Sequence, residues 1–525
     1  MKTLPPLIAS ICMAVFLLTY VGSVLYHGLS YEALAALTKP VVACLLLLVF
    51  YNVNTDATET LFFAGITVAA IGYIAIAGFL PSEGQITSNR LQGVFQYANA
   101  TGIFLSAGAF MTRLSEKRGR YAPFLECALL LTQSVGSILV YIAGWTMYLI
   151  KNRHIRPAAA MCGFGLSLLA AGVIYTSAFV VSIPPISLLP PIALIIFSQK
   201  ISHAVEVIAR QKWVLWVGGG LFIIAAVALL FVRASNPIVT YLDRLVQISD
   251  GLRLMLRYPL GIGPGAWQFH YPAYQSAHFY AAKIHSEYVS IGVNAGILAV
   301  MPLLVFLGYW LKHQKWEKKA VCAGMLLLHA VLDIPFSFLP LVFVTAMLFA
   351  ETLPKSSRIL PTACRGILIL PLVLFVFVFA SSAVKNQVTW IVRAGDSVRA
   401  AEFLEKWSMR NDTDAVLTRM ALYAKMGEHD QLDKAFSELT RPNAVAHSQM
   451  ARSLIHRERY EDAAAQALMC AEQAPYSPMG YDLMEQILPQ LHSALQADHQ
   501  KKIAIIKGSS VEHPLFTYKK RLMSE

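Results

Sequence analysis

The feature that most constrains this chain is a succession of apolar runs that continues from the N-terminal region to about residue 384. A transmembrane helix needs about 20 mostly apolar residues to cross the hydrocarbon core of a bilayer. A single cleaved signal peptide cannot explain so many runs. The sequence therefore predicts an all-α polytopic membrane domain over residues 1–384.

The composition agrees with lipid as the solvent, because 56% of the 525 residues are hydrophobic and 14% are charged. The net charge of +12 does not indicate nucleic acid, since the basic residues lie mainly in short connectors between apolar runs. The seven cysteines are scattered, with no spacing typical of a disulfide framework or a zinc site. The cysteines therefore predict neither a disulfide framework nor a zinc site.

The pattern predicts about 12–13 spans, with soft boundaries. One stretch, 121–150, is expected to form a hairpin or re-entrant pair. The other expected spans are 6–26, 34–52, 60–80, 95–112, 157–182, 184–199, 213–232, 288–311, 319–335, 336–353 and 366–384.

The basic connectors predict the topology through the positive-inside rule. Two of them, 113–120 and 151–156, flank the 121–150 stretch, so this stretch must enter the membrane and return, with a turn near residues 132–137. The N-terminus is then inside, whereas the large loop 233–287 and the chain after 384 are extracytoplasmic. The other cytoplasmic connectors are 199–212, 312–319 and 354–365, and a second outer loop is 81–94.

From residue 385 to 525 the sequence is polar and amphipathic, without long apolar runs. Residues 420–436 align with 450–466 at an offset of 30. A repeat of this length is typical of helix pairs such as tetratricopeptide (TPR) repeats, whose usual period is about 34 residues. We expect a soluble, TPR-like helical domain.

The segment 258–296 is the richest in chemistry-bearing residues. Its "GIGPG" (261–265) lacks the strand-then-helix setting of a dinucleotide site, so its glycines are expected to let the backbone turn tightly. Trp267 and Tyr280 suit the headgroup level of a membrane, and they equally suit stacking on sugar rings. Composition alone does not separate these two interpretations.

His285 lies where this loop re-enters the membrane, with Glu287 two residues further on. A histidine is a base near neutral pH, although an interfacial histidine bonded to lipid or backbone is the simpler interpretation. In 241–259, Arg244 is followed by charged residues at roughly helical spacing, which a solvated amphipathic helix would also show. These residues are Asp250, Arg253 and Arg257.

Arg90 lies on the outer side, just before a span that contains Asn99. An arginine there either snorkels to the headgroups or grips a phosphate. His329 and Asp333 are four residues apart, so we expect them to share a helix face near the outer end of a span, where ionisable side chains are costly and usually functional or paired. The topology places Arg90, Arg244, His285 and Asp333 on one extracytoplasmic side.

These motifs resemble the O-antigen ligase and O-antigen polymerase family. The resemblance covers most of residues 60–350 and lies in five elements. They are "RLQGVFQYANA" (90–100), the R-x5-D pair of Arg244 and Asp250, "PLGIGPGAW" (259–267), "YQS" (274–276) and "HSEYVSIGVNAGI" (285–297). It implies a GT-C-like membrane glycosyltransferase of the bacterial cell membrane. Such an enzyme transfers a glycan from an undecaprenyl-diphosphate carrier to the hydroxyl of a glycan, lipid or protein acceptor.

The resemblance also implies residue roles. Arg90 and Arg244 would neutralise the departing diphosphate, and His285 would accept the proton of the attacking hydroxyl. The resemblance therefore implies no metal and no cofactor. Members of the family often carry asparagine where this chain has Ser286 and arginine where it has Val135. The TPR-like domain would face the cell wall and bind a protein partner.

Two other classes of protein remain alternatives. A transporter or flippase of lipid-linked glycans predicts symmetric halves with binding groups near the membrane midplane. The sequence shows no internal repeat between halves, and its polar residues gather on one membrane face. A membrane anchor for the C-terminal scaffold is the third interpretation, although an anchor needs only one span.

Overall fold

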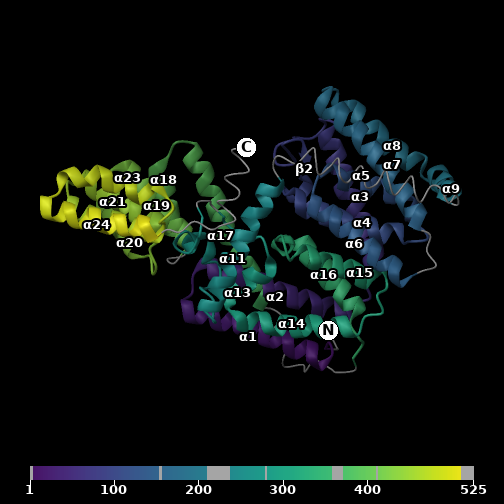
Figure 1. Cartoon of the computed structure of the whole chain (residues 1–525), viewed down its shortest axis with the longest axis horizontal. Helices are drawn as coiled ribbons and strands as arrows, with labels where there is room; N and C mark the ends of the chain where they lie inside the picture. Colours follow the sequence, from purple (N-terminus) through teal and green to yellow (C-terminus); the bar gives the residue numbers. More distant parts are fainter. Residues whose placement is uncertain are drawn as a thin grey trace. The chain divides into compact units, whose positions relative to one another are not determined.

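The computed structural model describes residues 4–152, 157–209, 237–277, 281–356, 370–408 and 412–509. The expectation of an all-α chain is confirmed, because the secondary structure of these residues is helical apart from one short antiparallel pair, β1 (Ile86–Thr87) and β2 (Arg90–Leu91) (Figure 1). The chain divides into two compact units, each assembled from three separate segments. The first unit holds Met1–Ser10, Ala43–Thr240 and Phe306–Leu360, and the second holds Ile11–Val42, Tyr241–Val305 and Pro361–Glu525.

Four described helical stretches are long and apolar enough to cross a membrane. They are Leu7–His27, Tyr31–Asn52, Ala57–Ile76 and Gly163–Val180. Four shorter apolar helices also occur, such as Leu339–Thr352. Candidate membrane-spanning helices are thus present, whereas the full count of 12–13 stays a prediction. The predicted span 213–232 lies outside the described residues.

The first unit packs small residues where its helices approach closely. In α3 and α4, a Cβ added at Gly108 would lie 3.3 Å from the Leu61 carbonyl oxygen and 3.8 Å from the Gly65 Cα atom. Helices in lipid associate through such contacts, since apolar burial alone gives no preference for protein over lipid. The helices of this unit are α3 (Ala57–Ile76), α4 (Ala98–Arg113), α5 (Ala122–Leu131), α6 (Val135–Lys151), α7 (Pro157–Tyr175), α8 (Leu189–Ile196), α9 (Ser198–Ala209), α15 (Lys318–His329) and α16 (Leu339–Thr352).

Short helical turns connect several of these helices. They are η1 (Gly93–Phe95), η2 (Gly119–Tyr121), η3 (Thr176–Val180), η4 (Pro184–Leu188) and η6 (Pro335–Ser337).

The predicted break inside 121–150 is confirmed. Helix α5 ends at Leu131 and α6 begins at Val135, so the turn falls within the predicted 132–137. Gln133 adopts a φ of +49° in this turn, a left-handed conformation that no helix continues through. Whether the two helices enter and leave on the same side of a membrane stays a prediction.

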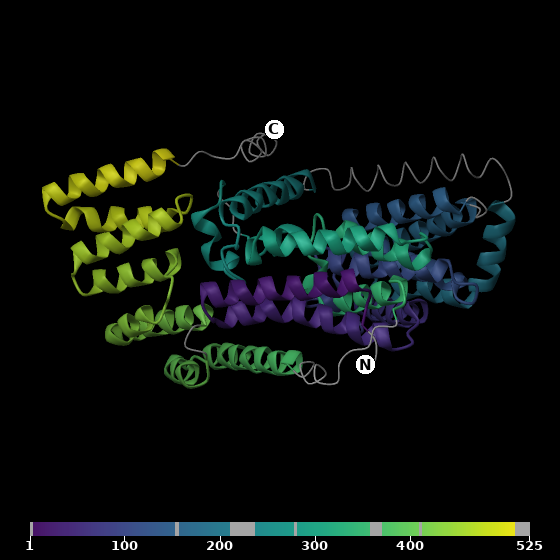
Figure 2. The same cartoon turned by 90° about the horizontal axis from the view of Figure 1, so that it is seen from below.

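The second unit contains two long N-terminal helices and the segment of the predicted outer loop. Helices α1 (Leu7–His27) and α2 (Tyr31–Asn52) lie side by side in both views (Figures 1 and 2). Helices α13 (Glu287–Ala295) and α14 (Ile297–Lys312) are separated at Gly296, whose φ is +81°. A Cβ there would lie 1.8 Å from the Pro259 carbonyl oxygen, so only glycine allows the loop to pass. The remaining elements of the loop are α11 (Pro237–Arg257), α12 (Trp267–His270) and η5 (Tyr271–Ala273).

The C-terminal part of this unit is a series of polar helices. Helix α17 (Leu370–Arg393) runs without interruption through the expected domain boundary at 385, and the first wholly polar helix is α18 (Ser397–Trp407). Side chains of Asp396, Asp412 and Asn443 accept hydrogen bonds from backbone N–H groups that the first turns of helices leave open. The later helices are α19 (Thr413–Met426), α20 (His429–Ser437), α21 (Ala444–His456), α22 (Tyr460–Gln473), α23 (Pro478–Ile487), η8 (Leu488–Gln490) and α24 (Ser493–Ser509).

Helices α19 to α22 form two successive pairs joined by short turns (Figure 2). The first helices begin at Thr413 and Ala444 and the second at His429 and Tyr460, an offset of 31 residues in both cases. Small buried residues such as Ala451, Ala463 and Ala467 pack the second pair together. The helical repeat is therefore present, and its kinship to TPR repeats stays a prediction.

Candidate functional site

In the first unit, the Asp333 carboxylate contacts the side-chain amide of Asn99, although the two residues are far apart in the sequence. Asp333 is 3% exposed, and its oxygens accept hydrogen bonds from the Tyr97 hydroxyl at 2.8 Å and from Asn99 Nδ2 at 2.6 Å. The backbone N–H of the next residue, Ile334, also donates a hydrogen bond to Asp333 at 2.8 Å. Burial of a carboxylate is tolerated only when such donors surround it. Asp333 thus has its donors in place.

The network extends through two serines to a histidine. Ser134 Oγ donates to Asn99 Oδ1 at 2.9 Å and lies 2.8 Å from Ser137 Oγ. Ser137 Oγ in turn lies 3.2 Å from His329 Nε2. Both serines come from the turn between α5 and α6 or the start of α6, so the break in 121–150 supplies polar groups to the interior of the unit.

Arg90 joins the same network at its edge. Ser88 and Asn89 have φ values of +50° and +57°, the two positive values that a tight hairpin turn requires, and this turn sets Arg90 at the start of β2. Arg90 Nε donates to the Thr132 carbonyl oxygen at 3.1 Å, and Arg90 Nη2 lies 3.5 Å from Asn99 Oδ1. The structure therefore brings Arg90, Asn99 and Asp333 together, as members of one polar cluster.

The expectation that His329 and Asp333 share a helix face is wrong, although both residues belong to this cluster. His329 and Asp333 do not share a helix face, because α15 ends at His329 and Asp333 lies in the following turn. They belong to the same network through Ser137 and Asn99. Hydropathy alone does not mark this ending, because "LLLHAVLDIPFSF" stays mostly apolar on both sides of it.

In the second unit, α11 carries the four charged residues expected there, Arg244, Asp250, Arg253 and Arg257. Asp250 is 1% exposed and organises the predicted outer loop. Its carboxylate accepts hydrogen bonds from the Tyr271 hydroxyl at 2.9 Å, from Ser276 Oγ at 2.6 Å and from the Ser276 N–H at 3.1 Å. Arg253 forms an ion pair with the same carboxylate. These bonds make Asp250 a positioning residue for the loop.

Burial and the Asp250 carboxylate together raise the pKa of Tyr271 far above its usual value of 10.0. Its hydroxyl is therefore a permanent donor to Asp250 at physiological pH. The ring of Trp267 stacks on Tyr271 with centroids 3.9 Å apart, and its indole N–H donates to the Ala281 carbonyl oxygen at 2.9 Å. Trp267 is only 5% exposed, so it belongs to the interior of the loop. Tyr280 lies outside the described residues.

His285 is tied to α11 at the end of the loop. Its backbone N–H donates to Gln247 Oε1 at 3.3 Å. Arg244 precedes Gln247 by three residues on α11, and residues at this spacing are neighbours on one helix face. The structure therefore brings together Arg244 and the segment that carries His285. Arg257 lies at the end of α11, with its guanidinium over the Tyr258 ring at 5.6 Å.

Lys39 of α2 is a charged residue that the sequence analysis did not identify as a candidate. Glu287 and Lys283 both exert electrostatic effects on it. The signal was present as a lysine inside an apolar run, a costly placement that usually has a partner or a function. Gln247, Ser134 and Ser137 were also missed, because neutral polar residues in apolar or amphipathic segments carry no distinctive pattern.

The predicted site residues therefore form two groups. Arg90, Asn99 and Asp333 belong to the first unit. Arg244, Asp250, Arg253, Arg257, Trp267, His285 and Glu287 belong to the second unit. That both groups serve one site stays a prediction.

Within the described residues, no group of three or more histidine, cysteine, aspartate or glutamate side chains is arranged to hold a metal ion. Searches with this chain against protein-family models, curated proteins and solved structures find no match.

Proposed function

We propose that this chain is a membrane glycosyltransferase of the O-antigen ligase or O-antigen polymerase type. It would transfer a glycan from an undecaprenyl-diphosphate carrier to an acceptor hydroxyl on the outer face of the bacterial cell membrane. The observation that carries the proposal is the hydrogen bond from the His285 N–H to Gln247 on α11. It holds the backbone of His285 next to the helix turn that carries Arg244, which supports a base and a cation acting at one place.

The reaction follows from these residue types. The acceptor oxygen attacks the anomeric carbon of the glycan, its proton passes to the His285 imidazole, and a new C–O glycosidic bond forms. The bond between that carbon and the diphosphate oxygen breaks, and its electron pair leaves with the diphosphate. Arg244 balances the negative charge that develops there, a form of stabilisation that is strong where water is excluded.

Arg90 has a parallel role in the first unit. Its guanidinium is positioned by the Thr132 carbonyl oxygen and approaches Asn99. A guanidinium presents several N–H donors in a planar fork, a geometry that suits a phosphate oxygen. Asp333 orients Asn99 and thereby acts on Arg90 indirectly.

The acceptor is a second glycan, a lipid or a protein, and the proposal covers polymerase and ligase alike. The protein is a multi-pass membrane protein with its C-terminal helical domain on the extracytoplasmic side. The paired helices α19 to α22 have the form of a protein-binding scaffold, and the proposed partner of this domain is the acceptor or a protein that delivers it.

The test is transfer by the full-length chain in vesicles that contain an undecaprenyl-diphosphate-linked glycan. The assay measures release of undecaprenyl diphosphate together with extension or attachment of the glycan. His285→Ala and Arg244→Ala are expected to lower the rate by about 100-fold or more, the usual loss when a general base or a charge-stabilising group is removed.

His313→Ala and Arg452→Ala are matched controls, because both residues are exposed. If the His285 and Arg244 variants formed product at the wild-type rate, the proposed mechanism would be ruled out. Movement of the donor between leaflets without release of undecaprenyl diphosphate would favour the flippase instead.

A further inference from the structure

A cavity of about 100 Å³ lies in the second unit where three chain segments meet. Its walls come from the turn between α1 and α2, from the "GIGPG" loop with α12, and from the helical domain at Thr413 and at 438–441. A water molecule needs roughly 10–15 Å³ of such space, so the cavity holds several waters or one ring of similar size. None of the residues assigned to transfer lines it.

The glycines of "GIGPG" allow this loop to approach the turn between α1 and α2 closely. Gly263 and Gly265 have φ values of +109° and +74°, which confirms the expected tight turns. A Cβ at Gly263 would lie 3.1 Å from the His27 ring, and a Cβ at Gly265 would lie 2.7 Å from the Glu32 carbonyl oxygen. His27 Nε2 lies 3.2 Å from the Gly261 carbonyl oxygen. The loop is thus fitted closely to the α1–α2 turn.

The helical domain closes the cavity through polar contacts. Arg441 Nη1 donates to the Ile262 carbonyl oxygen at 3.4 Å. Glu32 Oε1 accepts a hydrogen bond from the Asp414 N–H at 3.3 Å, whereas Glu32 Oε2 is buried without a hydrogen-bond partner. The cavity therefore offers a guanidinium donor and a carboxylate acceptor from different walls.

The remaining lining groups are neutral or aromatic. Thr413 and Thr440 supply hydroxyls, and Phe269 supplies a half-buried ring. Burial and the nearby Arg441 charge lower the pKa of His270 to about 4, so His270 is a neutral donor and acceptor at physiological pH. A second lining carboxylate, Glu438, is held in an ion pair with Arg419.

We propose that this cavity binds one sugar residue of the glycan substrate, an inference that rests on the proposed transferase function and extends it. A sugar hydroxyl both donates and accepts, so it suits a wall with a guanidinium opposite a carboxylate. The apolar face of a pyranose ring packs on an aromatic ring such as Phe269. The helical domain then takes part in holding the glycan.

The charged groups that line the cavity favour a neutral sugar over a phosphate. A phosphate would gain from Arg441 but would face the Glu32 carboxylate and a neutral His270. Like charges at close range in a partly buried site are strongly unfavourable. A neutral polyol meets no such penalty.

The experiment is saturation-transfer NMR on the full-length protein in nanodiscs. The probes are the methyl glycosides of glucose, galactose and N-acetylglucosamine, and inorganic phosphate is the anionic comparison. At least one glycoside is expected to bind, and Arg441→Ala or Phe269→Ala is expected to weaken it about tenfold, since loss of one charged hydrogen bond or one ring contact is of that order. Arg452→Ala, an exposed arginine on α21, is the matched control and should bind as wild type.

Thr440→Val is a second variant that keeps the side-chain shape and is expected to weaken binding by a smaller factor. The inference is overturned if no glycoside binds, if phosphate displaces the glycoside, or if the Arg441 and Phe269 variants bind as tightly as wild type. Failure of the proposed function looks different, because glycosides would then bind while the Arg244 and His285 variants still transferred glycan normally.

Discussion

Asn99 Nδ2 lies 2.6 Å from Asp333 Oδ2, although 234 residues separate the two side chains. Asp333 also accepts from Tyr97 at 2.8 Å, and Asn99 lies next to Arg90. This pair therefore connects the residue that the resemblance assigns to diphosphate binding with the turn after α15.

Asp333→Asn is expected to lower the stability of the first unit by about 1–3 kcal/mol, because an amide NH2 then faces donors that need an acceptor. The measurement is thermal unfolding in nanodiscs. Tyr97→Phe removes one donor and leaves the carboxylate with its other partners, so its loss should be about 1 kcal/mol. Equal stability of Asp333→Asn and wild type would show that the carboxylate is not needed as an acceptor.

Asp250→Asn is expected to loosen the segment 262–277, since the Tyr271 hydroxyl and the Ser276 N–H and hydroxyl all donate to this carboxylate. Amide hydrogen exchange over residues 262–277 should rise at least tenfold, which corresponds to about 1.4 kcal/mol of lost protection. Asp482→Asn, an exposed aspartate on α23, is the control. An unchanged exchange rate would remove Asp250 from its positioning role.

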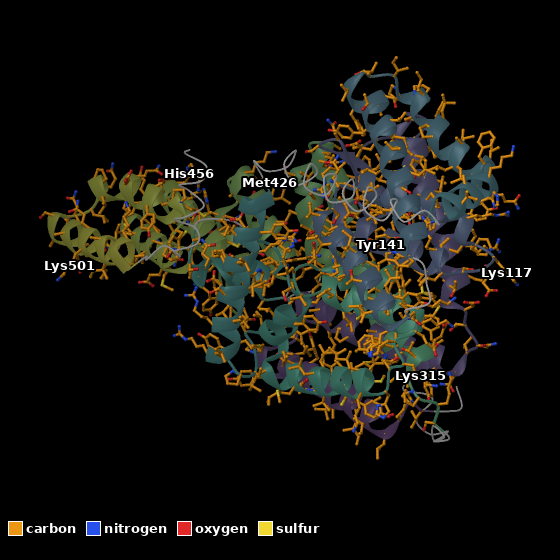
Figure 3. The ribbon with its side chains drawn as sticks, turned by 45° about the vertical axis from the view of Figure 1, so that its right-hand side comes forward. Lys117, Tyr141, Lys315, Met426, His456 and Lys501 are labelled. Atoms are coloured by element: carbon orange, nitrogen blue, oxygen red, sulfur yellow. The ribbon has the colours of Figure 1, made fainter. Side chains whose placement is uncertain are left out.

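Glu126→Gln is expected to destabilise the first unit by about 3–5 kcal/mol, because Arg113 would be left buried without its partner. Glu126 is 1% exposed and accepts from Arg113 Nη2 at 2.5 Å, from the Tyr141 hydroxyl at 2.7 Å and from Ser167 Oγ at 3.0 Å. Tyr141 is labelled in Figure 3. The measurement is unfolding in a detergent titration.

The matched control is Glu59→Gln, whose ion pair with Arg118 is about one-third exposed on both sides and is worth at most about 1 kcal/mol. The double variant Arg113→Met with Glu126→Gln should recover part of the loss, since no charge is then stranded. A Glu126→Gln protein as stable as Glu59→Gln would contradict the prediction.

The stability of the second unit is expected to fall as the pH is lowered from about 6.5 to about 4. Burial and Arg441 keep His270 neutral down to about pH 4 in the folded protein, whereas an unfolded histidine has its ordinary pKa of 6.5. The unfolded chain therefore binds more protons within this window, and the free energy of unfolding decreases there as pH falls.

The contribution of His270 is at most about 3 kcal/mol, at 1.36 kcal/mol for each pKa unit. Unfolding followed at pH 7 and pH 5 should show a smaller pH effect in His270→Gln than in wild type. His492→Gln, an exposed histidine, should keep the wild-type dependence. An identical pH effect in the His270 variant would show that His270 titrates normally in the folded state.

Several features follow from the sequence because they depend on neighbouring residues. Apolar runs long enough for a bilayer predicted helices such as α1, α2 and α3, and the repeat offset predicted the helix pairs from α19 to α22. The turn in 121–150 was predicted from the basic connectors on either side, and the tight turns of "GIGPG" from the conformational freedom of glycine. Each of these signals is local, and local patterns fix local structure.

Contacts between remote segments were decided only by the tertiary structure. Nothing in the sequence pairs Asn99 with Asp333, binds the His285 backbone to Gln247, or joins Arg441 to the "GIGPG" loop. The sequence marked Asp250 and Trp267 as site residues, the structure shows that both are buried in the loop, and a role for them in binding stays a prediction. The physical reason is that hydropathy and spacing determine which face of a segment is polar, whereas the partner of a polar group depends on which segments pack against it.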